Sequence, residues 1–274
     1  MNPIEKLSVS APKLSRIMMI VIKTQEQIVK MRKAGNLAAQ LLNYIEPFVQ
    51  EGVSTQHLND LCEEFTQKNG AISAPLNYHG FPKSICTSIN DVVCHGIPAE
   101  EDILKDGDIV NVDVTVILDG YHGDTSRTFM IGDVDEKIKN LVQRAENAMY
   151  RGIAAVEPGK YLYEVGKAIE KYIGKFDYSI VQTYGGHGIG KKFHEDPHVL
   201  HHFSKDNKIR LREGMIFTVE PMINMGKSYD VVTSSVDGWT VTTVDGSVSA
   251  QFEHTILVTS EGTEILTQGV VIIA

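Results

Sequence analysis

Four acids and one histidine are the residues of this 274-residue chain whose types and settings point most directly to chemistry. They are Asp113, Asp124, His187, Glu220 and Glu253. Asp113 and Glu220 each stand in a run of β-branched and apolar residues, where an acid is rarely left without a partner. Two carboxylates about 4 Å apart repel by about 4 kcal/mol at an effective dielectric constant of about 20. If these acids converge in the fold, they need cations beside them.

Metal ions are the expected source of that positive charge. Lysine and arginine are scarce near the four acids, and Arg127 is the nearest basic partner in the sequence. Carboxylates with a single imidazole suit hard or borderline divalent ions such as manganese, iron(II), cobalt or zinc. Bridging carboxylates can hold two such ions about 3.5–4 Å apart, as in two-metal hydrolases. Taken singly, Asp124 and His187 are read more readily as ordinary loop residues.

Two shorter motifs resemble known sites but lack what those sites require. His194–His198 matches the H-E-x-x-H pattern of zinc proteases, which works only on a helix, where both histidines face one way. Pro197 would lie inside that helical turn, and an interior proline costs about 3 kcal/mol. Residues 185–191 nearly match a phosphate-binding loop, but Lys192 stands where a serine or threonine must hold magnesium. We expect neither motif to act as such a site.

The two aspartates are expected on one β-hairpin. Residues 108–118 alternate between valines on one face and polar residues, Asp113 among them, on the other. The Asp-Gly pair at 119–120 is typical of a tight turn into a second strand around 125–131. Asp124 would then lie across the hairpin from Asp113.

Helical spacing of apolar residues predicts two helices before this hairpin and two after it. The first begins at a sequence that resembles a capping box, Thr24-x-x-Gln27, and ends at Glu46. The second ends near Gly70. The other expected elements are helices at about 135–156 and 162–174, a first strand at Ile17–Lys23, a strand and turn at 84–94, and strands and loops from Tyr178 on.

The second half of the chain repeats the first at an offset of 107 residues. Residues 104–113 align without gaps on 211–220, which puts Glu220 where the first half has Asp113. Each half has two helices followed by a strand that carries an acid, and duplication explains that shared order. The expected halves span about 24–134 and 135–260. Two such halves packed together would bring Asp113 and Glu220 to a shared cleft.

Composition narrows the class of protein. The chain has 26 Lys and Arg against 35 Asp and Glu, a net charge of −9, which argues against broad binding to nucleic acid. Its three cysteines form no complete disulfide framework and no C-x-x-C pair, which favours a reducing compartment. No stretch approaches the roughly 20 apolar residues of a membrane span. We therefore expect a cytoplasmic protein.

The amino terminus is expected to be a flexible leader, residues 1–16, ahead of a single catalytic domain at 17–274. The apolar stretch before Lys23 is too short for a signal peptide, and no small-residue cleavage site follows it. Met18 or Met19 could be the true start instead of the first methionine.

Eight short stretches together resemble the type I methionine aminopeptidases, bacterial-like members of the M24 metallopeptidases, across roughly residues 18–268. They are Tyr78–Ser84, Asn90–Pro98, Gly107–Asp113, His122–Thr125, Gly186–Gly190, Phe193–Pro197, Thr218–Met222 and Ser249–His254. The resemblance implies the family's pita-bread fold, an α+β architecture of two pseudo-symmetric halves, each with helices backing an antiparallel sheet. A dinuclear metal site lies between the halves, in agreement with the internal repeat.

By this resemblance the five ligand candidates divide between two ions. Asp124 and Glu253 would bridge the ions. Asp113 would bind one ion, and His187 with Glu220 would bind the other. The implied cofactors are thus two divalent ions per chain: cobalt, manganese, iron(II) or zinc.

The resemblance also implies a substrate site. The residues that would bind substrate are Tyr78, Phe81, Cys86, His95, Phe193, His194 and Trp239. Among them, His95 and His194 would contact the scissile peptide. Without the resemblance, His95 could be a hydrogen-bonded turn residue. The alternative for His194 is a surface cluster with His198, His201 and His202.

The implied activity is removal of the initiator methionine from nascent proteins whose second residue is small. Hydroxide between the two ions would attack the first peptide bond. Glu220 would carry the proton from the nucleophile to the leaving nitrogen, and His194 would donate to the developing oxyanion. The implied partners are nascent amino termini, with no nucleic acid or membrane bound and the chain a monomer.

Some details depart from the family pattern. Phe81 and Pro75 stand where members often have tyrosine and cysteine, which changes the polarity expected in the pocket. Trp239, the one tryptophan, could alternatively serve in core packing. Only 33 residues separate His187 from Glu220, too few for the insert of type II enzymes, and no Cys-rich extension precedes the match.

Two alternatives remain open at this point. A proline-specific aminopeptidase uses a similar metal set but usually carries an extra amino-terminal domain. A catalytically inactive pita-bread module that binds peptides would have lost metal ligands, and this chain keeps all five. Residues 1–33 hold seven Lys and Arg against two Glu, which fits either a solvated leader or weak docking near the ribosomal exit tunnel.

Overall fold

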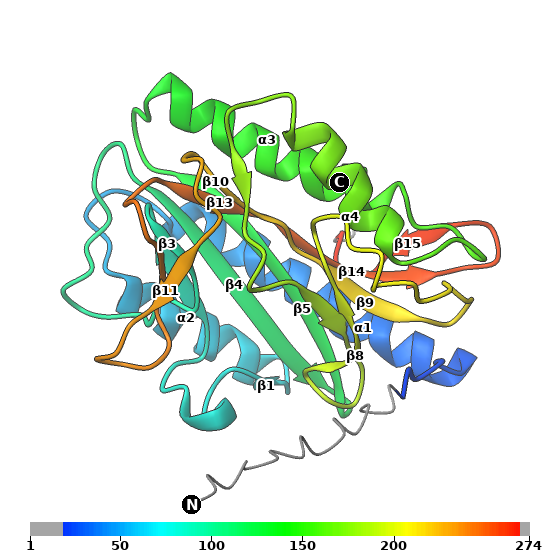
Figure 1. The fold of residues 1–274 in the computed structure, drawn as a ribbon. Helices are drawn as coiled ribbons and strands as arrows, with labels where there is room; N and C mark the ends of the chain where they lie inside the picture. Colours follow the sequence, from blue (N-terminus) through cyan, green and yellow to red (C-terminus); the bar gives the residue numbers. More distant parts are fainter. Residues whose placement is uncertain (1–18, 269–274) are drawn as a thin grey trace, which may run out of the picture.

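A long β-sheet with α-helices packed against it forms the body of the protein (Figure 1). The computed structural model describes residues 19–268. Within that range, nine strands make up the main sheet, in the order β1-β4-β5-β14-β9-β7-β8, with β2 beside β4 and β15 beside β14. Two three-stranded sheets, β13-β10-β6 and β11-β12-β3, complete the α+β architecture that the sequence predicts.

The helices are α1 (Gln25–Ile45), α2 (Thr55–Lys68), α3 (Glu136–Ile153) and α4 (Tyr163–Ile173), with short 3-10 turns at Glu46–Phe48 and Tyr78–Gly80. The first nine strands are β1 (Ile72–Ser73), β2 (Cys86–Ile89), β3 (Val92–Cys94), β4 (Ile109–Leu118), β5 (Tyr121–Met130), β6 (Ser179–Ile180), β7 (Gly186–Gly188), β8 (Glu195–Val199) and β9 (Ile216–Val219). The last six are β10 (Met222–Asn224), β11 (Val231–Thr233), β12 (Val241–Thr243), β13 (Ser249–Gln251), β14 (Glu253–Val258) and β15 (Thr263–Ile265).

The predicted hairpin is confirmed as β4 and β5, although β5 begins at Tyr121, earlier than expected. Asp119 and Gly120 have φ angles of 52° and 76°, as a tight turn with two left-handed residues requires. Thr115 pairs with Asp124 across the hairpin. The valines of β4 face α1 and belong to one buried apolar cluster with it, which leaves the other face of the strand for polar side chains.

All four predicted helices are present, and the capping box of α1 is confirmed. Thr24 accepts the backbone N–H of Gln27, and the Gln27 side chain accepts the backbone N–H of Thr24. This pair satisfies amide donors that a helix leaves free at its first turn. The helix therefore begins where the sequence predicts.

The first strand predicted at Ile17–Lys23 is wrong for the part that the structure describes. Residues 19–23 belong to no helix or strand, and the backbone N–H of Lys23 donates one hydrogen bond to the carbonyl oxygen of Gly214 at 2.8 Å. One such bond does not make a ladder. The leader at 1–16 and the candidate start Met18 lie outside the described residues.

Each half of the repeat has its own helix pair. Helices α1 and α2 pack on the β4–β5 side of the sheet, and α3 and α4 pack on strands of the second half. Strand β5 pairs with β14, where Glu253 lies opposite Ser126, so strands of both halves are neighbours in one sheet. Within residues 19–268 no helix is both long and apolar enough to span a bilayer.

Candidate metal centre and substrate pocket

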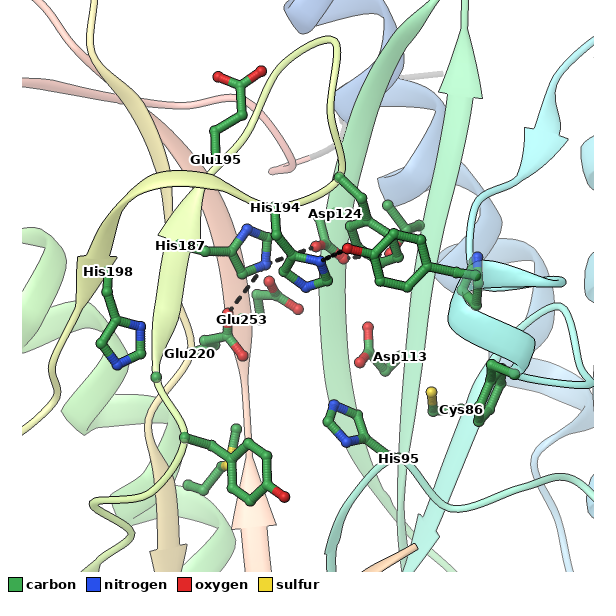
Figure 2. A pocket seen from close by; sticks show the side chains of 18 of the residues that line it. Cys86, His95, Asp113, Asp124, His187, His194, Glu195, His198, Glu220 and Glu253 are labelled. Carbon is green, nitrogen blue, oxygen red and sulfur yellow. Dashed lines mark hydrogen bonds and ion pairs between the residues drawn. The ribbon is translucent and has the colours of Figure 1, made fainter. Parts of the chain in front are cut away.

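One cavity of about 490 Å³ brings together every residue that the sequence predicts for the site (Figure 2). Its floor is the polar face of the main sheet, where β4, β5 and β14 present their acids. Its walls come from the segments that hold Tyr78, His95, His194 and Trp239. Residues far apart in the sequence therefore meet over one patch of the sheet.

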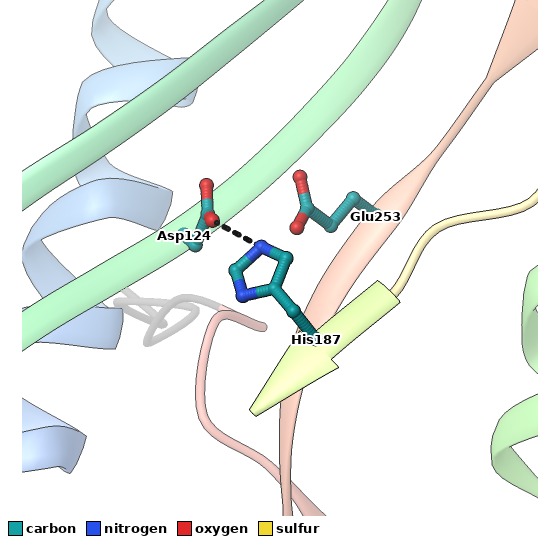
Figure 3. Close-up of side chains that lie close together, drawn as sticks. All are labelled: Asp124, His187 and Glu253. Atoms are coloured by element: carbon teal, nitrogen blue, oxygen red, sulfur yellow. Dashed lines mark ion pairs between the residues drawn. The ribbon is translucent and has the colours of Figure 1, made fainter. Parts of the chain in front are cut away.

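Asp124, His187 and Glu253 form the centre of the floor, with one potential ligand atom of each within 4.8 Å of the others (Figure 3). His187 Nε2 lies 3.5 Å from Asp124 Oδ2 and 3.7 Å from Glu220 Oε1. Asp113 lies on the Cys86 side of this group and Glu220 on the His198 side (Figure 2). The five side chains share one chamber.

The acids of the floor are costly to ionise together without a cation. Burial, reinforced by the charge of Asp124, raises the pKa of both Asp113 and Glu253 well above the usual range. Burial also raises the pKa of Glu220 to about 7, although His187 opposes that change. Among the described residues that line the cavity, none is a lysine or an arginine.

Arg127, the nearest basic residue in the sequence, does not supply the missing charge. Its guanidinium donates to Asn43 on α1 and to Glu46 in the 3-10 turn that follows, each at 2.9 Å. Side chains alternate along a strand, so Asp124 points to the cavity and Arg127 to the helix side. A partner close in sequence is therefore on the wrong face of β5.

His187 is the one basic group among the acids of the floor. Burial lowers the pKa of His187, but its hydrogen bond to Asp124 and the charge of Glu220 outweigh burial and leave that pKa raised. Its Nδ1 lies 3.1 Å from the carbonyl oxygen of Gly188. That contact directs Nε2 toward the acids, as ligand histidines require.

Three residues that sequence reasoning missed hold Glu220 in place. The Thr218 hydroxyl donates to Glu220 Oε1 at 2.7 Å and accepts the backbone N–H of His187 at 2.9 Å. Gln251 Nε2 donates to Glu220 Oε2 at 3.2 Å. The backbone N–H of Glu220 donates to His201 Nε2 at 3.1 Å. Thr218 precedes Glu220 by two residues, so the period of a strand could have identified it.

His201 is not part of a surface cluster, which corrects one alternative reading. Its side chain is 1% exposed, and burial lowers its pKa to about 3, so the ring is neutral. A neutral ring can accept at Nε2 only if its proton is on Nδ1. His198, in contrast, is exposed on β8. Since β8 is a strand, the zinc-protease reading of this segment is excluded as expected.

Aromatic rings form the wall expected to bind methionine. Phe81 and Trp239 meet edge to face with centroids 5.3 Å apart, and Tyr78 lies 4.9 Å from Phe193. Cys86 is buried at the same wall, and burial raises the pKa of its thiol, which is therefore neutral. Together these side chains make an apolar recess beside the polar floor.

His194 and His95 stand over the floor as neutral rings. Burial, with the charge of His187, lowers the pKa of His194 to about 3. The Tyr78 hydroxyl lies 2.7 Å from His194 Nδ1. Burial also lowers the pKa of His95, whose backbone has a φ of 57°. A left-handed φ at a non-glycine residue is uncommon and re-aims the side chain, here toward the cavity.

Comparisons with known proteins agree with this site. A model of metallopeptidase family M24 matches residues 29–260. The methionine aminopeptidase of Rickettsia prowazekii is 56% identical over 250 residues, covering 91% of this chain and 96% of that protein. The methionine aminopeptidase of Escherichia coli is 51% identical over 251 residues, covering 91% and 94%.

Solved structures give the same result. The crystal structure of the Rickettsia prowazekii enzyme superposes with a TM-score of 0.88, covering 91% of this chain and 100% of that one. A Xaa-Pro dipeptidase from Bacillus anthracis, 26% identical, reaches 0.72, and the match covers only 62% of its chain. Proline-specific relatives thus share the fold but extend beyond it. This chain belongs to metallopeptidase family M24 and, within it, to the methionine aminopeptidases.

Proposed function

We propose that this chain removes the initiator methionine from nascent proteins whose second residue is small, using two divalent metal ions. The observation that carries the proposal is the convergence of four acids and one imidazole under an apolar recess in one cavity. The recess suits the side chain of methionine, and the polar floor suits metal-dependent hydrolysis. Relatives that share half or more of this sequence are named for that activity.

The residues of the floor fit divalent ions. Carboxylates with one imidazole are a donor set for manganese, iron(II), cobalt or zinc, and no lysine or arginine is among the described residues that line the cavity. In the proposed assignment, Asp124 and Glu253 are shared between the ions. Asp113 serves one, and His187 with Glu220 the other. Ions in such a site supply a water activated near neutral pH and a Lewis acid for the carbonyl.

Glu220 is proposed to move the proton from the attacking water to the leaving nitrogen. A carboxylate within reach of both the water and the leaving nitrogen can take a proton from one and give it to the other. The hydrogen bonds from Thr218 and Gln251 fix the carboxylate at one place in the cavity. A shuttle has to be held in this way, because proton transfer requires hydrogen-bond reach.

His194 is proposed to donate a hydrogen bond to the developing oxyanion. A neutral imidazole carries one proton, and a Tyr78 hydroxyl that donates to Nδ1 leaves that proton on Nε2. Donors aimed at the position of the developing charge are worth about 3–4 kcal/mol each. His95, at the edge of the methionine recess, is proposed to contact the scissile peptide.

The partners and location are proposed on weaker footing. Nascent amino termini are the proposed substrates of a cytoplasmic monomer. Docking near the ribosomal exit tunnel depends on the basic residues of 1–33, of which 1–18 lie outside the described residues. Salt-dependent co-sedimentation with ribosomes tests that docking. Ribosome binding that does not change with salt would contradict it, because charge contacts weaken with ionic strength.

A peptide panel tests the proposed function. Purified protein with added manganese, cobalt, iron(II) or zinc is incubated with Met-Ala-Ser, its N-acetylated form and Ala-Pro-Ser, and the products are identified by mass spectrometry. We expect methionine release from the first peptide alone. Cleavage of Ala-Pro-Ser would indicate a proline-specific enzyme instead, and no cleavage with any divalent ion would indicate a peptide-binding module.

A further inference from the structure

A buried ion pair lies beside the loop that carries His194. Lys23 Nζ is 2.6 Å from Glu195 Oε2, and the two side chains are 3% and 9% exposed. In the other Lys and Arg ion pairs found within residues 19–268, both side chains are at least 29% exposed. Exposed ion pairs contribute little to stability. When a buried pair loses one partner, in contrast, the other charge is left buried without compensation.

The backbone next to this ion pair accommodates both charged groups. A Cβ atom on Gly190 would lie 2.7 Å from Lys23 Nζ and 2.8 Å from Glu195 Oε1, so a larger residue there would displace the charged ends of the pair. The backbone of Lys23 is in turn fixed by its hydrogen bond to Gly214. The His122 backbone N–H donates to the Gly190 carbonyl at 2.9 Å. Lys23, Glu195 and Gly190 thus form a closely packed contact between the segment before α1 and the sheet.

The pair closes the loop that leads from β7 to β8. Glu195 Oε1 accepts the backbone N–H of Lys192 at 3.2 Å, and Phe193 and His194 lie between these two residues. Phe193 stacks on His122 with centroids 5.6 Å apart and an interplanar angle of 19°. Figure 2 shows the Glu195 side chain directed away from the acids of the floor. Glu195 is therefore free to anchor the loop without joining the metal ligands.

We propose that Lys23 is a positioning residue for the peptidase reaction: its ion pair with Glu195, seated on Gly190, holds the loop at 190–195 so that Phe193 and His194 face the substrate. This inference rests on the proposed function. Lys23 precedes α1 and does not line the cavity. Misplacing a reacting group by about 1 Å through a remote change can lower a rate by about 10²-fold.

The test uses the full chain with four variants. Lys23→Met and Glu195→Gln each remove one partner, and the double variant Lys23→Met/Glu195→Gln removes both charges. Lys30→Met is the matched control, because Lys30 pairs with Glu26 on the surface at 3.2 Å. For each protein we would measure kcat and KM on Met-Ala-Ser, manganese affinity by calorimetry, the melting temperature, and backbone hydrogen exchange at 190–196.

We expect Lys23→Met to lower kcat roughly 10- to 100-fold and to raise hydrogen exchange at 190–196, with manganese affinity unchanged. The double variant should recover the melting temperature, because no charge is left unpaired, yet keep the low kcat. Recovery of kcat together with the melting temperature would overturn the proposal, since it would show a role in stability alone. Unchanged exchange at 190–196 in the double variant would also overturn it.

The hydrogen-exchange arm separates this inference from the proposed function. Wild-type protein that releases no methionine under any metal would reject the peptidase assignment. Loop exchange would still show whether Lys23 holds the segment with Phe193 and His194, because that readout needs no turnover. If Lys23→Met does not fold, the double variant, which leaves no buried charge, decides the outcome.

Discussion

At the scale of single residues, the site works through what surrounds its acids. Glu220 is contacted by Thr218 and Gln251 at its carboxylate and by His201 at its backbone. One hydroxyl, that of Thr218, contacts both Glu220 and the backbone of His187. Because the same atom fixes two proposed ligands, a change there should disturb both.

Replacing Glu220 by glutamine tests the proposed proton shuttle. The amide keeps the size of the side chain but cannot take up a proton, and general acid–base catalysis contributes about 10²–10⁴-fold. We expect Glu220→Gln to lose at least about 10²-fold in kcat on Met-Ala-Ser, while Glu213→Gln, an exposed acid, stays at the wild-type rate. Wild-type turnover by a metal-replete Glu220→Gln protein would exclude this role.

Thr218→Val tests the contribution of the shared hydroxyl. Valine keeps the β-branched shape but loses both hydrogen bonds, so kcat should fall about tenfold while unfolding free energy falls by about 1–3 kcal/mol. Thr263→Val is the matched control, because its hydroxyl donates to the Val156 carbonyl at 2.8 Å, away from the cavity. Equal effects of the two variants on kcat would contradict a special role for Thr218.

At the scale of elements, the sequence predicted what regular patterns encode. The alternation around Asp113 and the capping box at Thr24 set β4 and the start of α1 correctly. The strand predicted at 19–23 is wrong because an apolar run does not reveal which strand, if any, it would pair with. The position of this segment depends instead on the ion pair between Lys23 and Glu195. Periodic sequence patterns reveal contacts between residues two to four positions apart. They do not reveal a contact between residues as distant in the sequence as Lys23 and Glu195.

Only the part of the site that local sequence patterns reveal could be predicted from the residues alone. Acids among valines stood out locally, so Asp113 and Glu220 could be found from the residues themselves. His95, His194 and the aromatic wall required the family resemblance, because nothing in their own neighbourhoods marks them. The alternative that placed His201 in a surface cluster is wrong, because tertiary packing buries that residue.

The contact between α1 and β5 offers a test of how the helices pack on the sheet, because the two backbones approach closely at Gly123. A Cβ atom on Gly123 would overlap the backbone of Ala34 and Gly35 on α1. The same change at Gly152 meets side-chain atoms alone, Ile169 Cδ1 at 2.8 Å and Val219 Cγ1 at 3.2 Å, and no backbone. We expect Gly123→Ala to lower the unfolding free energy by about 1–3 kcal/mol or more, and Gly152→Ala by less. Urea unfolding of both variants checks the order, and a reversed order would contradict this packing.

At the scale of the whole molecule, part of the negative charge of the chain is concentrated at one place, the floor of the cavity. Four of its 35 acids meet at the cavity floor, and one of them, Glu220, comes from a strand equivalent to that of Asp113. We propose that the halves at 24–134 and 135–260 arose by duplication, which is supported by the alignment without gaps of residues 104–113 on 211–220. Strands β5 and β14, one from each half, are neighbours in the sheet, so the site would lie where the two copies meet and bound metal would link them.

Metal-free protein should become less stable as pH rises above about 7. The pKa of Glu220 is about 7 in the folded chain and about 4.3 in the unfolded chain, so this carboxyl keeps more proton in the folded state, and the raised pKa values of Asp113 and Glu253 act in the same direction. Buried histidines with lowered pKa values, such as His194 and His201, act in the opposite direction, but only below about pH 6.5, where an unfolded histidine is protonated. Thermal unfolding in chelator from pH 7 to 8 therefore measures the slope that the acids set.

Divalent metal should reverse that slope, because ions bind the deprotonated carboxylates of the folded state. In metal-free protein, Glu220→Gln should flatten the slope, and Glu213→Gln should leave it as in the wild type. A melting temperature that rises with pH between 7 and 8 in chelator would be inconsistent with an uncompensated group of buried acids.

A metal titration tests the central claim most directly. Protein depleted of metal is given manganese in steps, and methionine release from Met-Ala-Ser is followed at each step, for the wild type and for Asp124→Asn. We predict no release without metal, release that rises with added manganese in the wild type, and none in Asp124→Asn. Methionine release by metal-free protein, or full activity of Asp124→Asn, would contradict the account that this group of acids and histidine is the hydrolytic centre.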